Sequence, residues 1–352
     1  MTRQEIWSLV IEEQKRLGTN AAIANKLGVS PATISQVVNR KWKNVTEKMW
    51  LKLAAKLDYN PTGWQIVETL NSRMLNKVYD DAKKYSLWIA IAHRAGGGKT
   101  ATARAYYNSD GHKGVYYLAC GEWNRRQFVV ALAKSMGIDV EANKTCYQTT
   151  EQIANFLIQR RSMKPVVILD EADKLTQGAI RCLITIYNQV EDECGFIIQG
   201  TENLEVQFLR GIKHKKKGYD ELMSRFGRRF VRLFGANKTD VANICKVNGI
   251  NDPKKIANIW KECSPAQVQV GNKFMMMIND LRKLKRAVRR ELMIAGVDLN
   301  LSDNKITKGV APDLTDEDLT KQNLDDMSDF PKASKSLDLD KIAEEMSRQP
   351  NA

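Results

Sequence analysis

A short run of glycines followed by lysine and threonine, Ala95 to Thr100 (AGGGKT), has the composition of a phosphate-binding loop. Glycines let backbone N–H groups wrap phosphate oxygens, the lysine reaches the terminal phosphates, and the threonine hydroxyl can ligate Mg²⁺. The run follows an apolar segment, LWIAIA, and precedes a helical pattern, which is the context that such a loop needs. The sequence predicts a nucleotide site formed by Gly96, Gly97, Gly98, Lys99, Thr100 and Ala101.

The loop departs from the usual GxxxxGKT pattern at its first position, where His93 replaces glycine. A glycine there eases the turn out of the strand, and a histidine can adopt the turn at modest cost. The alternative interpretation is a flexible glycine-rich loop before an ordinary helix.

A second motif, VVILDEAD, places Asp170 71 positions after Lys99 and Glu171 directly after it. Its four aliphatic residues fit a strand that is buried on both faces. We expect Asp170, with Thr100, to hold the Mg²⁺ of Mg·ATP, and Glu171 to lie next to the attacking water as a catalytic residue. Acids at a strand end also cap helices, so the motif is specific only when it is paired with the glycine loop.

Strand-like runs alternate with helical patterns around these motifs, which favours a parallel sheet with helices on both faces. The expected strands are 87–92, 114–119, 165–169, 196–199 and 229–233. From Lys238 to about Ala295 the pattern is helical only and predicts a helical lid. The organisation resembles the AAA+ class of P-loop NTPases, with expected boundaries of 1–65 for an all-α N-terminal domain, 66–84 for a helical linker, 85–236 for the ATPase core, 237–298 for the lid and 299–352 for a disordered acidic tail.

Three further residues are candidates for catalysis. The strand ending in GTEN places Thr201 or Asn203 where a polar sensor orients water in AAA+ proteins, although Thr201 is equally suited to cap the next helix. The segment ELMSRFGRRF contains Arg225 in a Ser-Arg-Phe context, which in AAA+ proteins often reaches a neighbouring subunit's ATP. A structural salt bridge is the alternative for Arg225. For the lid arginine, Lys273 and Arg282 are both weak candidates.

The N-terminal segment has the spacing of a helix-turn-helix, with a short helix from Asn20, the turn Gly28-Val29-Ser30 and a second helix from Pro31. The second helix is similar to that of the lambda repressor and Cro class, and a helical bundle that binds another protein is the alternative. The residues expected to contact double-stranded DNA are Ser30, Thr33, Gln36, Asn39, Arg40 and Lys41.

Basic clusters inside the ATPase region are the other candidates for DNA contact. Arg125 and Arg126 follow the second strand, and Lys215 and Lys216 lie in the run KHKKK. The segment KLKRAVRR, Lys283 to Arg290, is a third basic surface. Such runs are usually solvated faces, and in a ring or filament they can follow a phosphate backbone.

Composition agrees with a nucleic-acid partner. The chain of 352 residues carries a formal charge of +14. Residues 301–352 hold twelve acidic and seven basic residues, a net of −5, so the first 300 residues carry about +19. Such a positive charge points to a polyanionic partner. A membrane surface is the second candidate partner. No apolar run is long enough to span a bilayer, and the six scattered cysteines predict neither a zinc cluster nor a disulfide framework, so a cytoplasmic location is expected.

The order of these motifs resembles the MuB-like target-selecting ATPases of transposable phages, over roughly Thr2 to Ala295. The resemblance implies ATP-dependent polymerisation into a filament on double-stranded DNA with little sequence preference. It also implies delivery of that DNA to a DDE transposase, with hydrolysis driving release. The alternatives are an ATP-gated transcription regulator and a helicase loader of the DnaC and IstB kind.

Overall fold

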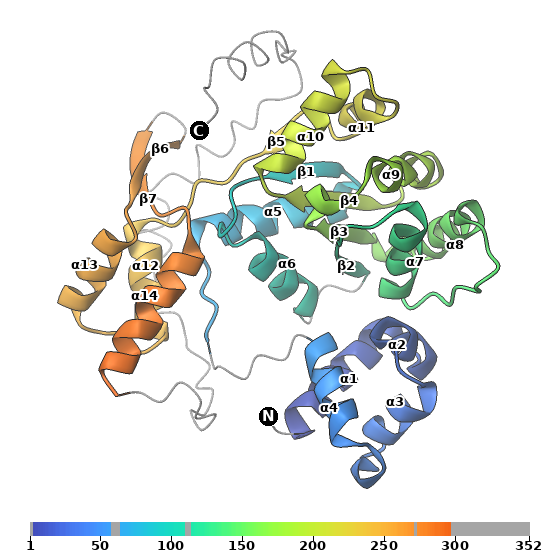
Figure 1. Cartoon of the computed structure of the whole chain (residues 1–352), viewed down its shortest axis with the longest axis horizontal. Coiled ribbons are helices and arrows are strands. Elements are labelled where there is room, and N and C mark those ends of the chain that lie inside the picture. The colour runs from blue at the N-terminus through green and yellow to red at the C-terminus, as the bar shows by residue number, and fades with distance from the viewer. Residues whose placement is uncertain (1–2, 58–63, 110–113, 271–272, 297–352) are drawn as a thin grey trace.

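A computed structural model describes residues 3–57, 64–109, 114–270 and 273–296 of the chain. These residues form a small all-helical group, a parallel sheet covered by helices, and a second small group of helices with a hairpin (Figure 1). No helix in these ranges is long and apolar enough to cross a membrane. The predicted disordered tail, 299–352, lies outside the described residues.

The N-terminal group packs its helices around one apolar cluster that includes Ile23, Ile34 and the fully buried Trp50. Its second and third helices meet at a turn in which Gly28 has a φ of 65°, a left-handed conformation that glycine adopts without strain. The elements are α1 (Arg3–Leu17), α2 (Asn20–Leu27), α3 (Pro31–Val38), the 3-10 turn Trp42–Asn44 and α4 (Glu47–Lys56).

The central sheet has five strands in the order β2-β3-β4-β1-β5, and its pairings are all parallel. The strands are β1 (Trp88–Ala92), β2 (Val115–Ala119), β3 (Val166–Asp170), β4 (Gly195–Gly200) and β5 (Phe230–Val231). All five predicted strands are confirmed, and β3 and β4 are buried along their whole length. Because the strands are parallel, their carboxyl ends meet at one edge, where ligands bind in such sheets.

Helices cover both faces of the sheet. On one face lie α5 (Leu70–Tyr85) and α6 (Lys99–Asn108). On the other lie α7 (Arg125–Ser135), α8 (Cys146–Ile158), α9 (Gln177–Val190), α10 (Glu202–Lys213) and α11 (Tyr219–Arg225). Helix α5 falls in the segment that the sequence assigned to a linker, yet its apolar stripe, with Leu75 and Tyr79 fully buried, packs on the sheet as part of its core.

The third group contains α12 (Lys238–Val247), α13 (Pro253–Glu262) and α14 (Leu281–Ile294), and we call it the lid. Between α13 and α14 the antiparallel strands β6 (Ala266–Val270) and β7 (Lys273–Met277) form a hairpin. The prediction of helix alone over this region is wrong at the hairpin. The alternation of Gln267 and Gln269 with Val268 and Val270 is a strand pattern too short to stand out beside the helices.

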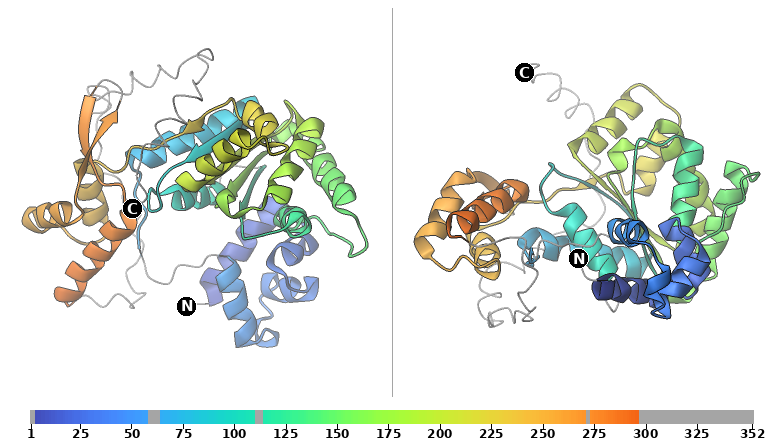
Figure 2. Two further views of the ribbon diagram at one scale, coloured as in Figure 1. Left: turned by 45° about the horizontal axis from the view of Figure 1, so that its top comes forward. Right: turned by 60° about the horizontal axis from the view of Figure 1, so that its bottom comes forward.

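The N-terminal group lies against the α6 and α7 side of the sheet domain (Figure 2). Glu13 is 5% exposed, and its carboxylate accepts hydrogen bonds from Lys26 at 2.7 Å and from the hydroxyl of Tyr107, on α6, at 3.0 Å. The Arg16 guanidinium lies 4.0 Å from the centre of the Tyr107 ring. The buried carboxylate is thus paired and hydrogen-bonded, as a buried charge must be. The N-terminal group is therefore attached to the same helix that begins at Lys99.

Candidate functional site

The glycine loop connects β1 to α6, and Lys99 is the first residue of that helix. Gly96 and Gly98 have φ values of 87° and 91°, which a residue with a side chain rarely adopts. A Cβ atom at Gly96 would lie 2.3 Å from Oδ1 of Asp280, at the start of the lid helix α14. Glycine at this position therefore permits both the turn and the close approach of the lid.

His93 occupies the position where the usual loop has glycine. Its φ lies outside the left-handed region, so the histidine causes no backbone strain there. Its ring packs against Gly97, where a Cβ atom would lie 2.4 Å from His93 Cδ2. The space for the His93 ring therefore depends on glycine at position 97. The loop thus accommodates a histidine where the usual pattern has its first glycine.

The burial of His93 predicts a pH-dependent loss of stability. Burial, with Lys99 nearby, lowers the pKa of His93 to about 4. Because the unfolded chain binds a proton near pH 6.5 and the folded chain does not, the histidine's contribution to stability is complete above that pH and is lost as pH falls towards 4. Between pH 7.5 and 5 the free energy of unfolding should fall by about 2 kcal/mol more in the wild type than in His93→Gln, as measured by urea denaturation.

Replacement of the exposed His214, at the end of α10, serves as the control in the same urea denaturation experiment. His214→Gln should retain the wild-type slope. If the free energy of unfolding fell equally with pH in the wild type and in His93→Gln, the pKa of His93 would not be lowered in the folded protein.

Lys99 and Thr100 open onto a cavity of about 640 Å³. The Lys99 ammonium donates hydrogen bonds to the backbone oxygens of His93 at 2.6 Å and Arg94 at 3.1 Å. Burial lowers its pKa, with Asp170 acting in the opposite direction. The cavity has the volume of a typical small-molecule site and places a cation at the start of a helix, where anions bind.

Asp170 and Glu171 reach the cavity from the end of β3. Asp170 is 1% exposed, whereas Glu171 is half-buried and has a φ of 55°, in the left-handed region. Such strain in a non-glycine residue is concentrated at functional sites. The Glu171 carboxylate lies 2.6 Å from Lys174 Nζ, and both side chains are more than 40% exposed. A pair this exposed contributes little energy, so Glu171 can leave it readily.

Thr201 lines the cavity at the end of β4, while Asn203 is exposed on α10 and is not among the lining residues. The Thr201 hydroxyl donates to Asp173 Oδ2 at 2.7 Å and accepts from the Asn203 backbone N–H at 3.3 Å. The hydroxyl therefore caps α10, as one of the two interpretations of the sequence expected, and also faces the cavity. Asp173 is a cavity residue that the sequence did not single out.

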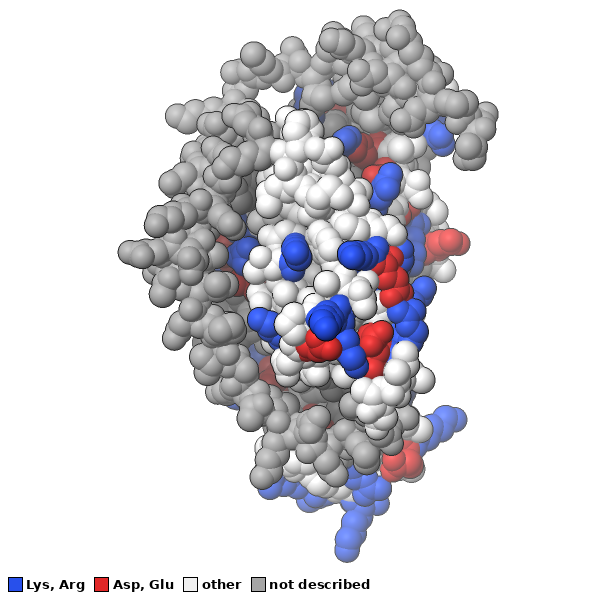
Figure 3. Space-filling model, turned by 90° about the vertical axis from the view of Figure 1, so that its left-hand side faces the viewer, with Lys and Arg blue, Asp and Glu red and all other residues white. Residues whose placement is uncertain are grey.

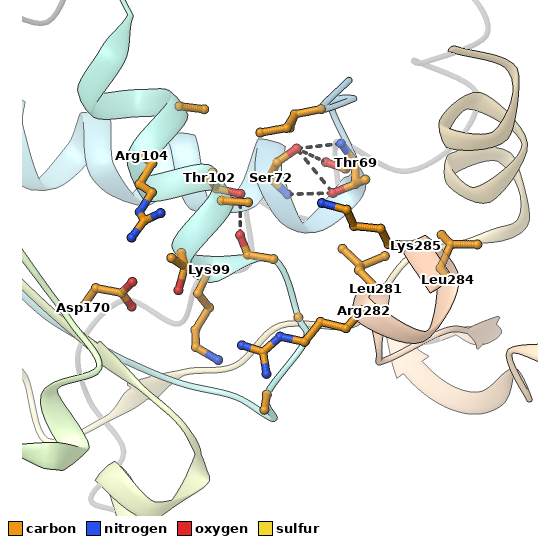
Figure 4. A pocket seen from close by; sticks show the side chains of 18 of the residues that line it. Thr69, Ser72, Lys99, Thr102, Arg104, Asp170, Leu281, Arg282, Leu284 and Lys285 are labelled. Carbon is orange, nitrogen blue, oxygen red and sulfur yellow. Dashed lines mark hydrogen bonds between the residues drawn. The ribbon is translucent and has the colours of Figure 1, made fainter. Parts of the chain in front are cut away.

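The lid contributes Arg282 to the cavity, which Lys99 enters from the opposite side (Figure 4). The backbone N–H of Leu281 donates to Gly96 O at 2.9 Å, which fixes the start of α14 on the glycine loop. Of the two lid candidates, Arg282 lies in the site, whereas Lys273 lies on the hairpin strand β7. Arg282 can therefore supply a second positive charge beside that of Lys99.

Removal of Arg282 should weaken ATP binding more than ADP binding. Hydrogen bonds to charged groups contribute about 1.5–3 kcal/mol, so Arg282→Ala should lower ATP affinity by roughly tenfold or more. Titration with fluorescent ATP and ADP analogues measures both affinities. The matched control is Arg286→Ala, one turn further along α14 and exposed. Equal losses for ATP and ADP would place Arg282 away from the terminal phosphate.

Apolar side chains gather at the end of the cavity away from Asp170. Segment 64–69 contributes Trp64, Ile66 and Val67, and the lid contributes Ile244 and Leu284. Asn248, at the end of α12, accepts a hydrogen bond from the Gln65 N–H at 3.0 Å and donates to the Gln65 carbonyl at 3.1 Å. Apolar side chains at one end, where Lys285 lies 5.0 Å from the Trp64 ring, and the cations Lys99 and Arg282 at the other suit a nucleotide with its base and phosphates. Sequence reasoning missed this segment because it has no motif.

Asn71, on α5, is a second residue that the sequence did not reveal. It is 2% exposed, donates to Gly97 O at 3.1 Å, and accepts from the N–H groups of Phe234 and Gly235 at 3.0 and 3.1 Å. Gly235 has a φ of 109° and lies in the connection from the sheet to the lid. One buried side chain therefore links the glycine loop to the hinge of the lid.

The donor set fits Mg²⁺ in the presence of phosphates. Mg²⁺ prefers oxygen ligands and usually takes one or two carboxylates together with waters and phosphate oxygens. Here the cavity offers the Thr100 hydroxyl and the buried Asp170 carboxylate. Over the part of the chain that the structure describes, no group of three or more His, Cys, Asp or Glu residues gathers into a metal cage. The residues thus suit a metal that arrives with a nucleotide.

Arg225, the candidate for a contact with a neighbouring subunit, is bound within its own chain. Its guanidinium donates to the Ile184 carbonyl at 3.1 Å and to Glu221 at 2.6 Å, and lies 4.4 Å from the centre of the Tyr187 ring. Its side chain is only 15% exposed. These contacts match the structural alternative for Arg225, and an intersubunit role would require them to break.

The candidate DNA residues of the N-terminal group cluster on and after α3. Ser30 caps the helix by accepting from the Thr33 N–H at 3.1 Å, and its hydroxyl is also hydrogen-bonded to the Thr33 hydroxyl at 2.9 Å, so both hydroxyls are already engaged. Arg40 is exposed with a φ of 57°, and its guanidinium lies 4.4 Å from the Trp7 ring. The other three residues, Gln36, Asn39 and Lys41, are half-buried or exposed. The surface that bears these residues is separate from the α2 contact with α7.

The other basic clusters are also on the surface. Arg126 donates to the backbone oxygens of Ala142 and Lys144, while Arg125, Lys215 and Lys216 are exposed. On the lid face, basic side chains are interspersed with acidic ones (Figure 3). In the third cluster Arg290 pairs with Glu262 and Lys283 donates to Ser264. Within the segment Lys283 to Arg290, the charge of Arg290 is therefore partly neutralised.

Comparison with known proteins defines the class of the domain. Residues 82–208 match the family model of the AAA domain. This span contains the glycine loop and VVILDEAD, and its sheet has the fold described above. The chain thus contains an AAA-type P-loop ATPase domain.

Several solved structures are similar at low identity. Cdc6p from Pyrobaculum aerophilum is 13% identical with a TM-score of 0.48, over 66% of this chain and 65% of that one. AMPPCP-bound DnaA from Aquifex aeolicus is 14% identical with a TM-score of 0.42, over 66% and 65%. The Thermotoga maritima RuvB Holliday junction branch migration motor is 14% identical with a TM-score of 0.40, over 66% and 67%. The chain thus spans slightly less than two thirds of the first two proteins, and no curated protein matches it.

Proposed function

We propose that this protein is an ATP-controlled, largely non-sequence-specific double-stranded DNA-binding protein that assembles on target DNA and activates a DDE transposase. The observation that carries the ATP part is the convergence of Lys99, Asp170 and Arg282 on one cavity with an apolar end. The DNA part is supported by the exposed polar and basic residues of α3 and by the charge of about +19 on the first 300 residues.

In the proposed mechanism the glycine loop and Lys99 bind the phosphates, and Thr100 and Asp170 hold Mg²⁺. The metal neutralises charge on the terminal phosphates when it is bound. Glu171 leaves Lys174 and accepts a proton from the attacking water, while Thr201 orients that water. Arg282 stabilises the negative charge that develops on the phosphate, because it enters from the lid opposite Lys99.

Assembly is the next part of the proposal. We assign a trans contact to the arginines at and just after the end of α11, where Arg225 is held by Glu221 and Arg228 is exposed and bonded to Asp220 at 2.9 Å. Arg228 has a φ of 55°, so the backbone there is strained. A neighbouring phosphate could draw Arg228 from Asp220 readily, because both side chains are more than half exposed, whereas Arg225 would also have to leave the Ile184 carbonyl and the Tyr187 ring. ATP would then lie between subunits.

The transposition role rests on the order of motifs, which resembles the MuB-like ATPases. The N-terminal group supports it by its position: it is attached to α6 through Tyr107 and leaves α3 exposed. Occupancy of the glycine loop and presentation of α3 are thus connected through one helix. In this proposal the lifetime of bound ATP determines how long the protein stays on DNA, and hydrolysis releases the protein.

DNase protection of several unrelated duplexes tests this proposal against the alternative of a transcription regulator. With ATP and Mg²⁺ we expect continuous protection that spreads along each duplex and disappears at high salt, because non-specific binding is electrostatic. A regulator that reads bases through α3 would protect one short palindromic site. Protection confined to such a site would contradict the filament proposal and favour the regulator. Strand transfer by a DDE transposase with and without this protein tests the activation step.

A further inference from the structure

The carboxylate of Asp170 is held by neutral donors on both of its oxygens. Gln199 Nε2 donates to Oδ1 at 2.9 Å, and the Tyr117 hydroxyl donates to Oδ2 at 2.9 Å. The Glu171 backbone N–H also donates to Oδ1, at 3.0 Å. Because these donors carry no net charge, they fix the carboxylate and leave its negative charge available to a cation.

Gln199 is itself held in one orientation. Its side chain is fully buried in β4, and its Oε1 accepts a hydrogen bond from the Tyr79 hydroxyl at 2.7 Å. Burial raises the pKa of Tyr79 well above its ordinary value, so the hydroxyl stays protonated and can donate. If the amide were reversed, its oxygen would face the carboxylate oxygen of Asp170 without a proton between them. Tyr79 therefore determines which end of the amide meets Asp170.

We propose that Gln199, oriented by Tyr79, is a positioning residue for the metal carried by Asp170. The relay runs from α5 through β4 to the end of β3, so a helix packed on one face of the sheet sets the geometry of a carboxylate in the cavity. Groups that hydrogen-bond metal ligands typically alter metal affinity by 10- to 100-fold. This inference rests on the proposed role of Asp170 in the nucleotide site.

Tyr79→Phe tests the relay by removing one hydroxyl and retaining the ring. In the full-length protein, binding of a fluorescent ATP analogue is titrated with Mg²⁺ and repeated in EDTA. We expect the Mg²⁺ concentration at half-saturation to rise about tenfold, while the affinity in EDTA stays at the wild-type value. A thermal melt of each variant checks that the protein remains folded. A change of equal size with and without Mg²⁺ would overturn the proposal, because it would indicate a general effect on the domain.

The matched control is Tyr106→Phe. Its ring lies 5.1 Å from that of Tyr79, and its hydroxyl donates to Asp80 at 2.8 Å rather than to Gln199. This variant should keep the wild-type Mg²⁺ midpoint, and an equal shift there would contradict the relay.

Gln199→Leu provides a second arm. It should raise the midpoint as Tyr79→Phe does, and the double variant should raise it no further, since both act through one contact. Additive shifts would overturn the relay. A wild-type protein whose ATP binding shows no Mg²⁺ dependence would refute the role of Asp170 itself, an outcome distinct from an unshifted midpoint in Tyr79→Phe.

Discussion

Lys99→Ala should abolish ATP binding and assembly on DNA together. The Lys99 side chain is buried at the first position of α6 and lines the cavity. Each hydrogen bond from a charged donor contributes about 1.5–3 kcal/mol. If Lys99 donates two such bonds to the phosphates, their loss lowers ATP affinity on the order of 100-fold or more. Equilibrium titration with a fluorescent ATP analogue, followed by sedimentation with duplex DNA, measures both effects.

Lys254→Ala is the matched control, since it removes an exposed lysine from α13 of the lid. This variant should bind ATP and sediment with DNA as the wild type does. If Lys99→Ala kept the wild-type ATP affinity, the assignment of Lys99 and the glycine loop to the nucleotide site would be contradicted.

Glu171→Gln should bind ATP normally and hydrolyse it about 100- to 10,000-fold more slowly, the range expected when a general base is removed. The amide is nearly isosteric with the carboxylate and cannot accept a proton from water. Because release from DNA is proposed to follow hydrolysis, the variant should form long-lived complexes on DNA. Phosphate release measures the rate, and challenge with competitor duplex measures the lifetime.

The exposed Glu191, at the end of α9, provides the control through Glu191→Gln. It should hydrolyse ATP and leave DNA at wild-type rates. Normal turnover in Glu171→Gln would show that another group activates the water.

The parallel sheet could be predicted because its strands are short, apolar and separated by helical patterns. The run VVIL in β3 is buried on both faces, and such runs differ clearly from amphipathic helices. The hairpin β6-β7 could not be predicted, because its two strands have only five residues each and lie between strongly helical segments. Helix α5 was missed as a core element since its sequence shows an apolar stripe but not what the stripe contacts.

The candidate site shows the same limit. Lys99, Asp170 and Glu171 were found because their chemistry is concentrated in short motifs. Asn71 and Gln199 are single amides whose partners lie 26 and 29 positions or more away, so no local spacing reveals them. Arg282 was one of two weak candidates, and only the folding of the lid onto Gly96 distinguishes it from Lys273.

Nucleotide dependence of binding to random-sequence duplex DNA tests the central claim most directly. The wild-type protein is sedimented with unrelated duplexes in ATP and Mg²⁺, in ADP and Mg²⁺, and without nucleotide. The account predicts extensive co-sedimentation in ATP, and release in ADP or when ATP has been hydrolysed. Equal co-sedimentation under all three conditions would contradict it, because the P-loop ATPase would then not control DNA binding.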